Sequence, residues 1–121
     1  MTIAFWCVLV AALLPYAAVA FVKGLDPNNP RTGIKQLTGL SARAHSAHLN
    51  AFEAFPPFAA AVIISHLSLG WNTVTNILAL LFLAARLAHL GFYLADRQPP
   101  RSAAFTAGLL IVVVMFVHAA L

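Results

Sequence analysis

The chain has 121 residues, of which 62% are hydrophobic and only 8% are charged, namely seven Lys or Arg and three Asp or Glu. A soluble domain of this length has roughly 25% charged residues, so this composition excludes a surface that faces water on all sides. The chain is also too apolar to be disordered. An integral membrane protein is the remaining class.

The placement of the charges predicts the membrane spans. Residues 1–22, 54–85 and 102–121 contain no Asp, Glu, Lys or Arg. A membrane helix needs about 20 apolar residues, and the turn-forming sequence Ser68-Leu69-Gly70-Trp71-Asn72 divides the long middle stretch. We therefore expect an all-α integral membrane protein, a four-transmembrane-helix bundle with helices at about 2–22, 40–67, 73–94 and 102–121, in a single domain over 1–121.

The first span is expected to stay in the protein as an anchor. Ala18-Val19-Ala20 resembles the cleavage site of a signal peptide, which is the alternative. However, the segment lacks a basic start, and its apolar run is longer than a signal peptide usually has. The basic residues follow the span instead.

The charges of the connections predict the orientation. The first connection, Lys23–Leu37, has three basic residues and one acid, the second, Ser68–Asn72, has no charge, and the third, Asp96–Arg101, has two arginines and one acid. The positive-inside rule then gives a multi-pass protein of the cell membrane with connections one and three in the cytoplasm and both termini outside. Without a long basic tract, nucleic-acid binding is not expected.

Polar residues inside the second and third spans predict a site. At helical spacing, Arg43, Asn50 and Glu53 share one face of the second span. Arg86, His89, Tyr93 and Asp96 share one face of the third. Glu53 and Arg86 lie at similar depths, about 12–15 Å from one side, so we expect them to form an ion pair. That pair either fixes the helix register alone or belongs to a polar cavity open to the cytoplasm, with walls formed by Arg43, Asn50, Glu53, Arg86 and Tyr93.

Metal binding and a nucleophile from the protein are both unexpected. His45 and His48 lie together on another face of the second span, without the three or four convergent ligands that zinc prefers. Cys7 is alone in the first span, and no serine lies in a nucleophile-elbow sequence. We expect any reactive group to come from the ligand, with arginines stabilising its anionic form. Pro56-Pro57 is expected to interrupt the hydrogen bonding of the second span just past Glu53.

The second span also resembles a known family. The stretch Arg43-Ala44-His45-Ser46-Ala47-His48-Leu49-Asn50-Ala51-Phe52-Glu53-Ala54-Phe55-Pro56-Pro57-Phe58 is similar to the second-helix motif of MAPEG proteins, the membrane-associated proteins in eicosanoid and glutathione metabolism, and looks most like the bacterial branch. The resemblance covers essentially the whole chain. It implies a homotrimer in the lipid bilayer that holds glutathione between subunits. Family members conjugate glutathione to lipophilic electrophiles, reduce lipid hydroperoxides, or act as non-catalytic partners.

The resemblance also implies roles for individual residues. Asn50 and Glu53 match glutathione-contacting positions, His48 matches a polar position beside them, and Tyr93 resembles a tyrosine of the site. Arg101 lies close to where active members have the arginine that steadies the thiolate. The sequence departs from the family at two positions: Ser46 stands where transferases have an arginine that contacts glutathione, and His89 stands where eicosanoid enzymes have a tyrosine. Arg43 or Arg31 would have to compensate for the arginine missing at Ser46.

Two functional hypotheses follow. The first is a membrane-embedded glutathione-dependent transferase or peroxidase acting on small lipophilic substrates, with glutathione as co-substrate. The second is a catalytically silent membrane binding or scaffold protein of the same fold. In the first hypothesis Arg101, or Arg97, stabilises the thiolate. The expected catalytic residues are Arg101 and Tyr93, and the expected ligand-binding residues are Arg43, His48, Asn50, Glu53, Arg86 and His89.

Overall fold

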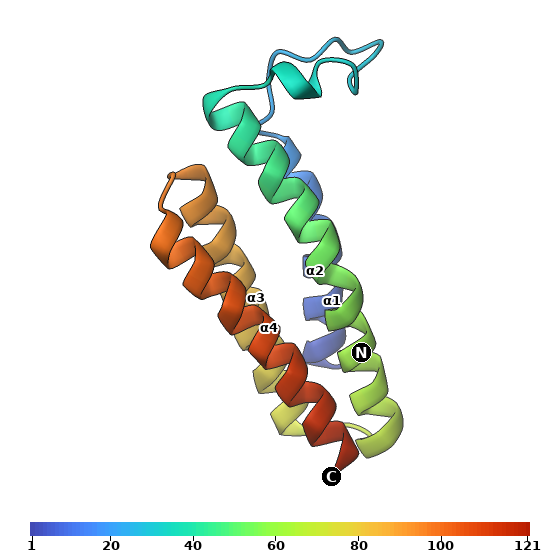
Figure 1. Cartoon of the computed structure of the whole chain (residues 1–121). Helices are drawn as coiled ribbons and strands as arrows, with labels where there is room; N and C mark the ends of the chain where they lie inside the picture. The colour runs from blue at the N-terminus through green and yellow to red at the C-terminus, as the bar shows by residue number, and fades with distance from the viewer.

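The computed structural model describes all 121 residues and is entirely helical. Its elements are α1 (Ile3–Val19), the short 3₁₀ helix η1 (Ile34–Gln36), α2 (Gly39–Leu69), α3 (Thr73–Leu94) and α4 (Gln98–Ala120). Figure 1 shows the four α-helices side by side as one elongated bundle. The all-helical fold with four helices is therefore confirmed.

Three of the four helices, α2, α3 and α4, are long and apolar enough to cross a membrane. The fourth, α1, is apolar but has 17 residues, which correspond to about 26 Å of helix. This is at the lower limit for crossing about 30 Å of hydrocarbon. The prediction of spans by length and composition is thus confirmed for three helices, while α1 is shorter than the predicted 2–22.

Some helices begin or end at residues other than the predicted ones, because capping side chains and prolines determine where a helix begins. The Thr2 side chain accepts a hydrogen bond from Phe5 N and starts α1. Helix α4 begins at Gln98 rather than at residue 102, because Pro99 and Pro100 occupy its first turn, where a missing N–H costs nothing. Helix α2 runs without a break through Pro56 and Pro57, so the expected interruption does not end the helix.

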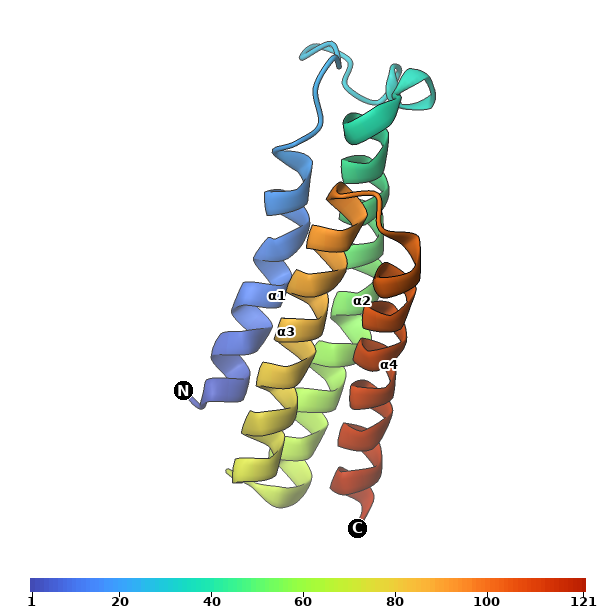
Figure 2. The same cartoon turned by 90° about the vertical axis from the view of Figure 1, so that its left-hand side faces the viewer.

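The connections alternate between the two ends of the bundle. The α1–α2 and α3–α4 connections lie at one end, and the α2–α3 connection and the C-terminus lie at the other, with the N-terminus nearer to that second end (Figures 1 and 2). Connections one and three therefore share one side, as the orientation prediction requires. That this side is the cytoplasm stays a prediction.

The core of the bundle consists mainly of small side chains that let the helices approach closely. Alanines from several helices surround one large contact, in which the rings of Phe58 and Phe82 stack with centroids 3.9 Å apart. Only 23 of the 121 residues are buried, and large apolar side chains of every helix face outward. Small residues inside and large apolar residues outside are the arrangement expected of helices packed in lipid.

Candidate functional site

The site is organised around Arg86, which points from α3 into the bundle and is only 3% exposed. Its Nη2 donates a hydrogen bond to Oδ1 of Asn50 on α2. The prediction of an ion pair between Glu53 and Arg86 is therefore wrong. The guanidinium of Arg86 binds the side-chain amide of Asn50, which lies one helical turn before the carboxylate of Glu53. Glu53 lies nearby but is exposed on the surface of the single chain.

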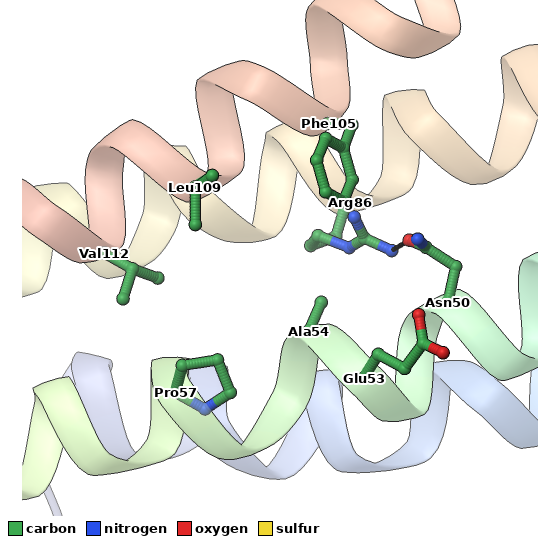
Figure 3. Close-up of a pocket in the computed structure, with 8 residues that line it drawn as sticks. All are labelled: Asn50, Glu53, Ala54, Pro57, Arg86, Phe105, Leu109 and Val112. Atoms are coloured by element: carbon green, nitrogen blue, oxygen red, sulfur yellow. Dashed lines mark hydrogen bonds between the residues drawn. The ribbon is translucent and has the colours of Figure 1, made fainter.

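Arg86 forms part of a pocket, which we call the inner pocket, with a volume of about 160 Å³. Figure 3 shows the polar side chains of Arg86, Asn50 and Glu53 at one end of it and apolar side chains at the other. The pocket is bounded by α2 and α4 with Arg86 between them. Its lining consists of Asn50, Glu53, Ala54, Pro57, Arg86, Phe105, Leu109 and Val112.

A second hollow, which we call the polar pocket, has a volume of about 250 Å³. It shares two wall residues, Asn50 and Phe105, with the inner pocket, so the two hollows adjoin. Its lining consists of Asn50, His89, Tyr93, Arg101, Ser102, Phe105 and Thr106. Together the pockets offer hydrogen-bonding groups at one end and an apolar surface at the other.

The side chains of the polar pocket hold one another in place. The guanidinium carbon of Arg101 lies 4.3 Å from the centroid of the Tyr93 ring, a cation–π contact between α4 and α3. His89 is 3% exposed, and its ring lies at 71° to the ring of Tyr93 in a T-shaped contact with centroids 5.4 Å apart. The Tyr93 ring thus contacts both the guanidinium of Arg101 and the imidazole of His89.

The charge of the site is unbalanced. Two guanidinium groups, Arg86 and Arg101, line the pockets, and Glu53 is the only carboxylate among the lining residues. Arg86 carries five N–H donors, of which the structure engages one, and its partner is a neutral amide. An incompletely paired cation in a buried position favours an anionic ligand.

A comparison with protein families matches residues 3–121 to the MAPEG family. The chain belongs to the MAPEG family. This family includes glutathione-dependent transferases and peroxidases as well as non-catalytic members. Comparisons with curated proteins and with solved structures give no match.

Six of the eight residues that the MAPEG resemblance and the helical spacing singled out meet at the two pockets. They are Asn50, Glu53, Arg86, His89, Tyr93 and Arg101. The convergence arises because the polar faces of α2 and α3 both turn toward the start of α4. Arg97, the alternative to Arg101, is exposed at the N-cap of α4 and lines neither pocket.

Arg43 and His48 lie outside both pockets and have other partners. Arg43 donates from Nε and Nη2 to the carbonyl of Leu94, at 3.3 and 3.2 Å, and so caps the C-terminal end of α3. Nδ1 of His48 donates to the carbonyl of Pro15 at 2.7 Å and ties α2 to α1. A role for these two residues in ligand binding stays a prediction.

Apart from Arg101, the contribution of α4 was not predicted, because the sequence after residue 101 reads as an ordinary apolar span. Ser102 and Thr106 are four residues apart and line the polar pocket, and Phe105, between them, borders both pockets. Two hydroxyls at helical spacing, directly after Arg101, were the available signal. No group of three His, Cys, Asp or Glu residues lies close enough to hold a metal ion.

Proposed function

We propose that this MAPEG protein is a membrane-embedded glutathione-dependent transferase or peroxidase that acts on lipophilic substrates. The observation that carries the proposal is the buried, incompletely paired Arg86 at the polar end of the inner pocket, which adjoins the polar pocket at Asn50 and Phe105 and is apolar at its other end. Such a junction suits a reaction between a charged water-soluble molecule and an apolar one. Family membership supports the same class of reaction.

The donor set fits glutathione, a tripeptide with two carboxylates, an ammonium group, amides and a thiol. Arg86 has free N–H donors for a carboxylate, and Asn50 and Glu53 beside it offer an amide and a carboxylate to the remaining polar groups. Bound glutathione would supply the nucleophilic sulfur. Cys7, the only cysteine, is buried in α1 and lines neither pocket, so the thiol at the site would come from the ligand.

Arg101 is the residue that we assign to thiolate stabilisation. A positive charge beside a thiol favours its anionic form, which is the reactive one. The Tyr93 ring holds the guanidinium at the edge of the polar pocket. Tyr93 and Arg101 therefore act as a unit, the ring positioning the charge.

The lipophilic substrate would occupy the apolar end of the inner pocket. Pro57 of α2 and Leu109 and Val112 of α4 form this end. Both helices carry large apolar side chains on their outer surfaces, so the substrate can come sideways from the bilayer. Because only the opposite end of the inner pocket is polar, the apolar part of the substrate would lie away from that end. The reactive part of the substrate would then point toward the glutathione sulfur.

Assembly as a homotrimer would complete the site. Glu53 is exposed on the single chain although it lies well inside α2, and a carboxylate facing lipid is costly. Neither hollow alone reaches the roughly 300 Å³ of a typical small-molecule pocket. A neighbouring subunit that covers Glu53 would remove both difficulties. We place the protein in the cell membrane, with connections one and three in the cytoplasm.

A conjugation assay on detergent-purified protein tests the proposal. We expect turnover of glutathione with a lipophilic electrophile or hydroperoxide, and Arg101→Ala should lower kcat/KM about 10- to 100-fold. Arg97→Ala is the matched control, since this arginine lies outside both pockets, and it should leave kcat/KM near the wild-type value. No turnover together with no heat of glutathione binding by calorimetry would exclude the enzyme.

A silent MAPEG binding or scaffold protein is the second candidate, and Ser46 favours it. Ser46 stands where transferases of the family have an arginine that contacts glutathione, and the loss of this arginine would remove about 1.5–3 kcal/mol of charge-assisted hydrogen bonding. A silent protein would bind glutathione weakly or not at all, and Arg101→Ala and Tyr93→Leu would have no phenotype. Glu53→Ala would still disrupt the trimer, which chemical cross-linking measures.

A further inference from the structure

One end of the bundle carries exposed basic side chains that take no part in the two pockets. Lys23, Arg31 and Lys35 lie on the α1–α2 connection, and Arg97 lies at the start of α4. All four are exposed, and we call them the basic band. The opposite end, with the α2–α3 connection and both termini, contains no Asp, Glu, Lys or Arg side chain.

The acids at this end leave the band unneutralised. Asp26 and Asp96 are the only two, so the four basic side chains keep an excess of positive charge. Oδ1 of Asp26 accepts a hydrogen bond from the backbone N–H of Asn28 at 2.9 Å, which engages it in its own turn. The band is therefore available to an external anion.

The connection that carries most of the band lies at one end of the bundle. It runs from residue 20 to residue 38, beyond the end of α2 and on the same side as the α3–α4 turn (Figures 1 and 2). Leu25, Ile34 and Leu37 are partly buried within it, whereas Arg31 and Lys35 are exposed. Because it continues directly from helices long and apolar enough to cross a membrane, we expect it to lie near the lipid headgroups.

We propose that the basic band binds the phosphate groups of anionic phospholipids in the adjoining leaflet. Lys and Arg side chains beside a membrane helix are attracted to anionic headgroups, and Arg also offers paired N–H donors to phosphate. An acidic protein or a nucleic acid would offer similar charge. The position of the band at the end of helices that can cross a membrane favours the lipid, because the headgroups of a bilayer around these helices would be next to it.

Electron spin resonance of spin-labelled lipids in reconstituted bilayers tests the proposal. The measured quantity is the association constant of labelled phosphatidylglycerol relative to labelled phosphatidylcholine. We expect a preference of at least about fivefold, the factor that one basic residue at the surface supplies. The triple variant Lys23→Gln/Arg31→Gln/Lys35→Gln, which leaves Arg97 as the last member of the band, should lower the preference severalfold, and Asp26→Asn should raise it.

Two further arms separate the sources of the effect. Raising the salt to about 0.5 M should weaken the preference of the wild-type protein, because exposed charges are then screened within a few ångströms. This arm needs no variant that might fail to fold. Gln36→Ala, a neutral change in the same connection, should leave the preference intact. A lipid preference that survives both the triple substitution and high salt would overturn the proposal. Loss of the lipid preference in millimolar inorganic phosphate would also overturn it.

Discussion

The buried guanidinium of Arg86 donates a hydrogen bond to the side-chain carbonyl of Asn50, 36 positions earlier in the chain, and joins α3 to α2. An amide satisfies one donor of the guanidinium but does not neutralise its charge. The contact therefore fixes the position of Arg86 while leaving its charge for a ligand. A carboxylate in the same place would fix the helices equally well and compete with that ligand.

Substitution of Asn50 separates these two effects. Asn50→Ala removes the only partner of a buried cation and should lower the free energy of unfolding by about 1–3 kcal/mol. Asn50→Asp should preserve that free energy, because the carboxylate still accepts the bond, yet weaken glutathione binding. Unfolding in mixed detergent and binding calorimetry measure the two quantities. Equal glutathione affinity of Asn50→Asp and wild type would contradict this account.

Gly108 offers a test of the packing behind Arg86. A Cβ at Gly108 would lie 3.7 Å from Cδ of Arg86 and 3.7 Å from Cε2 of Phe82, which is ordinary van der Waals contact. Gly108→Ala should therefore be tolerated and raise the free energy of unfolding by up to about 1 kcal/mol through helix propensity.

The contrasting variant at this position is larger. Gly108→Leu has no room and should displace Arg86, lowering stability by about 1–3 kcal/mol. Thermal unfolding in detergent compares the two variants with the wild-type protein. A fall in the melting temperature of Gly108→Ala as large as that of Gly108→Leu would show that the α3–α4 packing differs from that described.

The sequence was sufficient to predict much of the site, because helical periodicity fixes which residues share a face. Arg86, His89 and Tyr93 on α3 and Asn50 and Glu53 on α2 do line the pockets. Periodicity could not decide which of two acceptors, one turn apart, would meet the guanidinium. That choice depends on side-chain reach and on the relative height of two helices.

Contacts of polar side chains with the backbone of another helix could not be predicted at all. The Arg43 side chain caps the end of α3, His48 binds a carbonyl of α1, and Asn76 binds the first turn of α1. From the sequence, Arg43 and His48 were expected to bind the ligand, and Asn76 had no predicted role. The predicted start of α4, residue 102, was wrong for a different reason. The charges of Arg97 and Arg101 indicated that the connection extends to residue 101, whereas Pro99 and Pro100 already lie in the first turn of the helix.

Asn76 should be important for stability although it lies far from the pockets. Its Oδ1 accepts a hydrogen bond from the backbone N–H of Ala4 at 2.9 Å, within the buried part of the bundle. Asn76→Leu leaves that N–H without a partner and should cost about 1–3 kcal/mol. Asn76→Asp keeps the acceptor at the positive end of the α1 dipole and should cost less.

Hydrogen exchange of the Ala4 amide is the most direct measurement for this position. It should become faster in Asn76→Leu and remain slow in Asn76→Asp. The amide of Phe5, which is bonded to Thr2 Oγ1 at 3.3 Å, provides an internal reference. Unchanged protection of Ala4 in the leucine variant would mean that the cap contributes nothing to the folded state.

The contact between Arg101 and Tyr93 distinguishes a tyrosine that positions a charge from one that reacts through its hydroxyl. Tyr93→Phe retains the ring under the guanidinium, so kcat/KM for glutathione should change less than about threefold. Tyr93→Leu removes the ring and should lower kcat/KM about 2- to 30-fold, the range that corresponds to a cation–π contact of about 0.5–2 kcal/mol. The melting temperature of each variant provides the control for unfolding. If Tyr93→Phe lost as much activity as Tyr93→Leu, the hydroxyl would be the group that acts on the substrate, and the positioning role assigned to the ring would be wrong.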